Sequence, residues 1–201
     1  MTGQERNAVS AADEAAVARV RAALTDAAAR LAAAGARTEA LAEYVPPSRV
    51  LLVPRPERLR PLGSAWRLGV LLLMAEGADD SHSSSPTAGE SPMRLPALFA
   101  TGSLTRAHEP GRTTFIAASA ERRRQLRVAA FRGHYPPGTS VNFDAAPIPL
   151  DSSLVGAPGP LTVRDGDAFV RWVPSNPDAL TGFDAYLAER VALLVDPPQG
   201  A

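Results

Sequence analysis

The 201-residue chain contains no cysteine, and this absence constrains its fold more than any motif does. Neither a disulfide nor a thiolate-bound metal or iron–sulfur cluster can hold such a chain together. The fold must therefore rest on a packed apolar core, which a chain of this length is long enough to bury. We expect one domain over residues 1–201, with tails at residues 1–9 and 197–201.

All 21 basic side chains are arginine, because the chain has no lysine either. The absence of lysine excludes a Schiff base, a pyridoxal phosphate attachment, a phosphate-loop lysine and a Ser-x-x-Lys nucleophile. The absence of cysteine excludes a thiol nucleophile. Since no G-x-G-x-x-G motif is present either, we expect no cofactor and favour a protein without catalysis of its own.

The arginines are balanced by 21 acidic side chains, so the formal net charge is zero. A nucleic-acid-binding domain usually has a clear basic excess. No apolar run approaches the roughly 18 residues needed to span a bilayer, and the polar residues 1–11 do not form a secretory signal. We therefore expect a cytoplasmic protein that binds neither nucleic acid nor membrane. The heavy use of alanine, arginine, proline and glycine is typical of a GC-rich bacterial genome.

An alanine-rich stretch at residues 10–44 predicts the first helix, with Ser10 as its N-cap. Gly35 breaks or bends this helix, and residues 38–44 are expected to form a second short helical piece before two prolines end it. The large apolar residues of the first piece fall on one stripe, formed by Val17, Val20, Leu24 and Leu31. This stripe either packs on the protein's own sheet or forms a homodimer through a helix–helix contact.

The middle of the chain predicts strands and one helix. Residues 49–53 and 65–74 are strand-like, and we expect 65–74 to be one central strand paired with residues 96–106 across a disordered loop at 78–92. A second short strand is expected at 112–117 and another at 140–143. Between them Ser119 is expected to cap a helix that ends near Arg132, with Gly133 as a candidate C-cap.

The last third contains a hairpin signal, since residues 161–164 and 168–172 alternate and flank Asp165-Gly166-Asp167. The last helix starts either at residues 176–178 or at residues 181–184, where Thr181 and Asp184 resemble a capping box. Strands grouped in hairpins, with helices at the start, middle and end, predict an α+β fold built on a mainly antiparallel sheet.

The densest polar block is residues 119–144. Arg123 and Arg127 are four apart on the predicted helix and share a face, His134 follows that helix, and Arg106 ends an earlier strand. Asn142 and Asp144 are expected to point to the same side of the following strand. Because an arginine fork binds carboxylates and phosphates, we expect an anion pocket formed by Arg106, Arg123, Arg127, His134 and Asn142. The alternative is a solvent-facing helix with a capping histidine.

If the protein is an enzyme, we expect His134 and Asp144 to act as an acid–base pair. A metal site of His108, His134 and Asp144 has no support from spacing, because neither histidine belongs to an H-x-x-x-H or H-x-H pattern. We therefore expect no metal. Ser103 lacks the G-x-S-x-G elbow of a serine nucleophile, and residues 101–103 are more consistent with a bend in a strand.

Five blocks resemble a family of small, uncharacterised proteins from GC-rich, actinobacterial-type genomes: residues 62–73, 100–106, 119–144, 161–172 and 186–191. Some members of that family carry the label glutaminase, which implies amide hydrolysis. The serine-dependent glutaminases need a Ser-x-x-Lys motif and another amidase type needs a lysine partner, and this chain can supply neither. The resemblance therefore implies the label glutaminase, but no catalytic mechanism that this chain could use.

Three functions remain open from the sequence, and the third of them is a homodimeric structural protein that uses the N-terminal helix. The first is a non-catalytic α+β domain that binds a partner protein or a small anionic ligand. The alternative is a hydrolase or amidase that uses His134 and Asp144, with arginines binding the charge of the substrate.

Overall fold

The computed structural model describes residues 10–50, 53–75, 96–111, 118–173, 176 and 178–198. Three α-helices and one short 3-10 helix are formed by these residues: α1 Ala11–Ala33, α2 Ala118–Arg132, α3 Phe183–Val195 and η1 Ser152–Leu154. The strands are β1 Glu39–Val45, β2 Ser48–Val50, β3 Val53–Arg55, β4 Arg58–Leu68, β5 Leu71–Met74, β6 Leu98–Ala100, β7 Ser103–Arg106, β8 Ser140–Phe143, β9 Ala146–Ile148, β10 Leu161–Arg164, β11 Asp167–Arg171 and β12 Leu180–Gly182. The predicted α+β class, with an N-terminal, a middle and a C-terminal helix, is confirmed.

The largest sheet has the strand order β7-β8-β1-β4-β5-β6-β9, and it must curl strongly. Only two residues link β6 to β7 and only two link β8 to β9, although each pair is five strand positions apart. Five positions in a flat sheet would be about 24 Å, whereas two residues reach about 10 Å. The two ends of the sheet therefore meet, and a Cβ on Gly102 in the first link would lie 2.3 Å from the Phe143 carbonyl oxygen.

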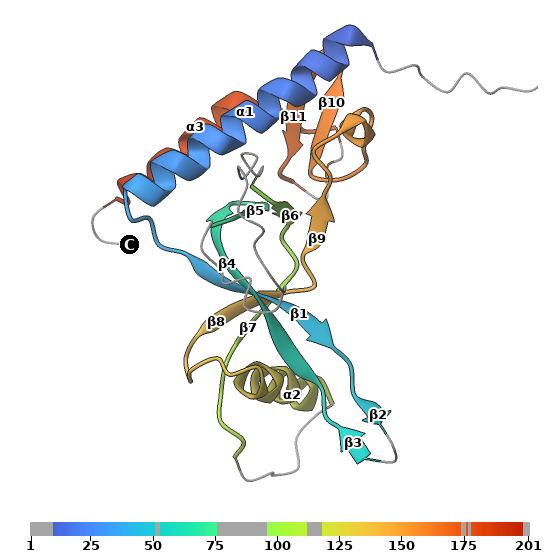
Figure 1. Ribbon diagram of the computed structural model, residues 1–201, viewed down its shortest axis with the longest axis vertical. Coiled ribbons are helices and arrows are strands. Elements are labelled where there is room, and N and C mark those ends of the chain that lie inside the picture. Colours follow the sequence, from blue (N-terminus) through green and yellow to red (C-terminus); the bar gives the residue numbers. More distant parts are fainter. Residues whose placement is uncertain are drawn as a thin grey trace, which may run out of the picture.

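The curled sheet has apolar residues on its inside and on two parts of its outside. Inside, Leu41, Ala65 and Leu72 form a small buried cluster. One outer region packs against α1, α3 and the hairpin β10–β11, and the other packs against α2. Figure 1 shows α1 and α3 at one end of the molecule and α2 at the other. The 11-residue strand β4 reaches both regions.

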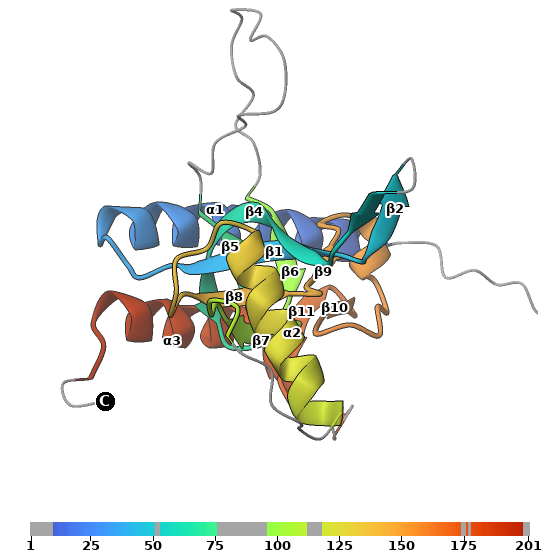
Figure 2. The same ribbon diagram turned by 90° about the horizontal axis from the view of Figure 1, so that it is seen from below.

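Helix α1 begins as predicted. Ser10 accepts a hydrogen bond from the Asp13 N–H at 3.1 Å, and the Asp13 carboxylate bonds back to the Ser10 N–H, which completes a capping box. The predicted apolar stripe is buried within the same chain, where it contacts α3 and β11. Figure 2 shows α1 and α3 running alongside each other.

The hairpin β10–β11 is confirmed, with Asp165 (φ 52°) and Gly166 (φ 80°) at its two-residue turn. Two positive φ angles are the pattern of a type I′ turn, which aspartate and glycine favour. The Gly166 N–H also donates to Asp13 Oδ1 at 3.0 Å, so the turn is fastened to the start of α1. Strand β12 pairs with β11 and leads directly into α3.

Residues 38–44 were predicted to be helical, and this prediction is wrong. They lie in β1, which pairs antiparallel with β4 and parallel with β8. The side chains alternate, because Leu41 faces the inside of the curl while Ala42 and Tyr44 face α2. Pairing with two strands outweighs a weak local helix preference.

The expectation of one strand at residues 65–74 is also wrong. The segment is a hairpin that pairs Leu68 with Leu71, and Gly69 (φ 65°) opens its two-residue turn. Residues 96–106 likewise form two strands: β6 pairs with β5 as predicted, but β7 pairs with β8. The bend expected at residues 101–103 lies between them. Of the strand expected at residues 49–53, the described residues 49, 50 and 53 belong to two short strands, β2 and β3, which pair with each other.

Two caps differ from the sequence prediction. The last helix has Gly182 as its N-cap and no side-chain cap bond, so the expected Thr181 capping box is wrong. Ser119 lies inside α2, which begins at Ala118. The predicted tail at 1–9, residues 199–201 of the predicted tail at 197–201, the strand at 112–117 and the loop at 78–92, with His82, lie outside the described residues. Within the described part of the chain, no helix is long and apolar enough to cross a membrane.

Candidate functional site

Helix α2 carries five arginines, and three of them are bound by the protein itself. Arg122 donates to the Glu57 carboxylate at 2.6 Å and lies over the Tyr44 ring, 5.3 Å from its centroid. Arg124 forms a paired contact with Glu121, with both N···O distances 2.9 Å. Arg132 donates to the Glu57 carbonyl oxygen at 3.4 Å. Each of these three arginines therefore has at least one hydrogen bond to a neighbouring group, and two of them are paired with a glutamate.

Glu57 is the buried acceptor of this group, with 9% of its surface exposed. Burial opposes its charged form, but the hydrogen bonds from Tyr44 and Arg122 outweigh burial and hold the pKa of the Glu57 carboxyl below its ordinary value. Glu57 therefore stays ionised and anchors α2 to the end of β4.

The remaining α2 arginines, Arg123 and Arg127, lie with Arg106 of β7 around one hollow of about 260 Å³. Among the described residues none of the three forms an ion pair, and the only side-chain hydrogen bond is a long one from Arg123 to the Ser119 carbonyl oxygen of its own helix. We call this site the arginine hollow. It is lined by Leu104, Thr105, Arg106, Arg123, Leu126, Arg127 and Ser140.

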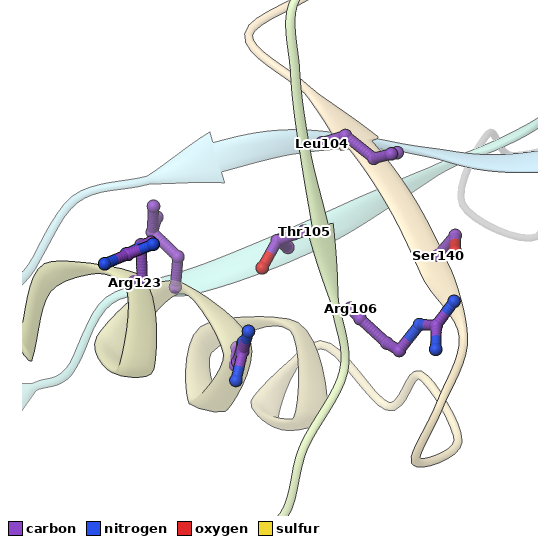
Figure 3. Close-up of a pocket in the computed structure, with 7 residues that line it drawn as sticks. Leu104, Thr105, Arg106, Arg123 and Ser140 are labelled. Atoms are coloured by element: carbon purple, nitrogen blue, oxygen red, sulfur yellow. The ribbon is translucent and has the colours of Figure 1, made fainter. Parts of the chain in front are cut away.

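Figure 3 shows how these side chains are arranged. Thr105 leaves β7 on the side of α2, toward Arg123, while Arg106 leaves the opposite side toward Ser140. Leu104 and Leu126 add apolar surface to the lining of the hollow, and 58% of Leu104 is exposed. The hollow thus combines three cationic groups, two hydroxyls and an apolar surface, which suits an anion that carries a short apolar part.

Asn142 was expected in the same pocket, but it does not line the arginine hollow. Its neighbours Val141 and Phe143 face α2, so Asn142 points to the other side of β8, inside the curl. There its amide donates to Glu39 at 2.7 Å and accepts from Arg67, whose Nε donates to Glu39 at 2.9 Å. Asn142 is 1% exposed and is held by these charged partners.

His134 lies at the C-terminal end of α2 in the left-handed region, with φ 67°. Its N–H donates to the Phe131 carbonyl oxygen at 3.0 Å, and the Tyr135 N–H donates to that of Ala130 at 3.4 Å, as in a Schellman motif. His134, and not Gly133, is therefore the left-handed C-cap residue. Gly133 is needed for packing instead, because a Cβ there would lie 1.9 Å from the Leu59 carbonyl oxygen.

Asp144 follows β8 and is exposed, with φ 55°, so it does not alternate with Asn142 on a strand as expected. Within the described part of the chain no hydrogen bond or ion pair joins His134 to Asp144. His108 donates its N–H to the Arg127 carbonyl oxygen at 3.2 Å. Across the described ranges, no group of three histidine, aspartate or glutamate side chains is placed to hold a metal ion.

Thr105, Ser140, Leu104 and Leu126 belong to the hollow and were not anticipated from the sequence. The missing signal was the pairing of β7 with β8, which sets Arg106 opposite Ser140. No protein-family model matches the chain, and comparison with curated proteins and with solved structures gives no match either. The function is therefore inferred from the geometry of the arginine hollow.

Proposed function

We propose that this protein is a non-catalytic binding domain that holds an anionic group in the arginine hollow. The observation that supports this proposal is the contrast among the arginines of α2. Arg122 and Arg124 are neutralised by glutamates, whereas among the described residues Arg123 and Arg127 have no carboxylate partner and line the same hollow as Arg106 of β7.

The charges around the hollow favour an anion that accepts from more than one guanidinium at once. A single exposed ion pair contributes at most about 1 kcal/mol, so one arginine would not hold a ligand. Three such contacts contribute at most about 3 kcal/mol, which corresponds to a dissociation constant no tighter than about 6 mM for a small anion such as inorganic phosphate. A ligand that also covers Leu104 and Leu126 gains further affinity from the burial of their apolar surface.

The experiment is a thermal-shift screen of the purified protein against inorganic phosphate, phosphosugars, dicarboxylates and glutamine. A ligand at ten times its dissociation constant stabilises the fold by about 1.4 kcal/mol, which raises the melting temperature by about 3–6 °C. The shift should be lost in Arg123→Gln and Arg127→Gln. It should persist in Arg164→Gln, which changes an exposed arginine of β10. A shift of equal size in all four proteins would contradict the proposal.

The hydrolase or amidase alternative, with His134 and Asp144, stays a prediction. Its test is ammonia release from glutamine by the wild type and by His134→Ala. Turnover that depends on His134 would favour the alternative over a binding domain.

A further inference from the structure

The outer edge of β7 runs along the arginine hollow. Strand β7 is the first strand in the sheet order, and among the described strands it is hydrogen-bonded only to β8. Leu104, Thr105 and Arg106 are consecutive, so their side chains alternate between the two faces of the sheet, and yet all three line the hollow. The hollow therefore extends around the strand edge, which α2 reaches only farther along the chain, where the His108 N–H donates to the Arg127 carbonyl oxygen.

The ladder between β7 and β8 shows which backbone groups face outward. The Ala107 N–H donates to the Thr139 carbonyl oxygen at 2.9 Å, in register with the pairing of Thr105 with Val141. Hydrogen-bonded and non-hydrogen-bonded pairs alternate in an antiparallel ladder. Ser103 and Thr105 therefore bond to β8, and the N–H and C=O groups of Leu104 and Arg106 point away from it.

These outward groups have no hydrogen-bond partner among the described residues. Natural sheets usually protect such an edge, because unpaired N–H and C=O groups can pair with another chain. Here the edge carries an exposed leucine and lies beside Arg123 and Arg127 of α2. A second strand placed there would satisfy the backbone and bring its side chains to the guanidinium groups.

We propose that the ligand of the arginine hollow is an extended acidic peptide segment of a partner protein, which adds to the edge of β7 as a further strand. This inference rests on the proposed anion-binding function and names its ligand. Main-chain hydrogen bonds to Leu104 and Arg106 hold the segment, and carboxylates on the face toward α2 contact Arg123 and Arg127. An apolar residue on the other face covers Leu104. The peptide is favoured over single-stranded nucleic acid, because a strand edge pairs with a backbone that has both N–H and C=O groups.

The probe is a short peptide of alternating glutamate and valine with a fluorophore at one end, followed by anisotropy with the full-length protein. Two isomers serve as matched controls, one N-methylated on all glutamates and the other on all valines. Only one of these two sets of N–H groups can face β7, because alternate residues bond to the same edge. We expect one isomer to bind at least about tenfold more weakly than the other, and Arg123→Gln and Arg127→Gln to weaken the plain peptide at least about fivefold.

Three results would overturn the inference. If both methylated isomers bind as tightly as the unmethylated peptide, or if both bind more weakly by the same factor, the peptide does not pair with β7 as a strand. If phosphate or a dicarboxylate binds in an arginine-dependent way and the peptide binds no more tightly, the anion site stands but its ligand is not a strand. If an oligonucleotide binds more tightly than the peptide, charge and not backbone pairing governs binding. Failure of the peptide and of every small anion would refute the proposed function as well.

Discussion

The hydroxyl of Tyr186 offers the sharpest test of how the C-terminal helix is fastened to the sheet. It donates to the Leu68 carbonyl oxygen at 2.8 Å and accepts from the Val70 N–H at 3.0 Å. Both partners belong to the β4–β5 hairpin. Its turn begins at Gly69, and this position needs a glycine because a Cβ there would lie 2.2 Å from the Tyr186 hydroxyl oxygen. Tyr186 is 3% exposed, so water cannot replace the bonds easily.

Tyr186→Phe removes both bonds and leaves the ring in place beside Arg190. Each bond contributes about 1 kcal/mol, and the Leu68 carbonyl stays buried, so we expect the free energy of unfolding to fall by about 2 kcal/mol. The melting temperature should fall by about 4–8 °C for a chain of this size. The measurement is urea unfolding followed by circular dichroism, with Tyr135→Phe as a control.

Tyr135 donates a single bond, to the Leu41 carbonyl oxygen at 3.1 Å, so Tyr135→Phe should cost about half as much. If Tyr186→Phe changes the free energy of unfolding by less than about 0.5 kcal/mol, the two bonds do not hold α3 to the hairpin.

Three further variants test the region around α2. Gly133→Ala forces a Cβ against the Leu59 carbonyl oxygen, so the free energy of unfolding in urea should fall by about 1–3 kcal/mol. If the urea concentration at the midpoint of unfolding does not change, α2 does not pack so closely on β4. His134→Gly removes the strain of a left-handed side chain and should stabilise the fold by about 0.5–1 kcal/mol, while anion binding should persist. The carboxyl of Glu57 has a lowered pKa, so its contribution to stability is present above its ordinary pKa of 4.5 and is lost as the pH falls through the lowered value. The stability difference between wild type and Glu57→Gln should therefore shrink between about pH 6 and about pH 3; a constant difference over that range would contradict the ion-pair account.

Much of the secondary structure was predictable because its signals are local. Ser10 and Asp13 cap α1, and Asp165 and Gly166 favour the turn they form, so sequence patterns within a few residues were sufficient. The errors arose where distant pairing decides the structure. Strand β1, which was predicted to be helical, is a strand because it pairs with β4 and β8, and the two-residue links that curl the sheet carry no periodic signal.

The candidate site was predictable in part for the same reason. Helical spacing put Arg123 and Arg127 on one face, and they do lie together, with Arg106 beside them. The position of Asn142 depends on which face of β8 meets α2, and that follows from the pairing of three strands. Likewise, the Leu104 and Arg106 backbone groups face outward only because β7 ends the sheet, a property that no local pattern reports.

The most direct test of the account is whether the three arginines of the hollow hold one anion together. The measurement is an NMR titration of the arginine Nε–Hε signals with inorganic phosphate at constant ionic strength. We expect the signals of Arg106, Arg123 and Arg127 to shift with one common dissociation constant, while those of Arg122 and Arg124 stay unchanged because these two side chains are already paired with glutamates. Equal shifts at all five arginines, or three unrelated dissociation constants within the hollow, would contradict a shared anion site.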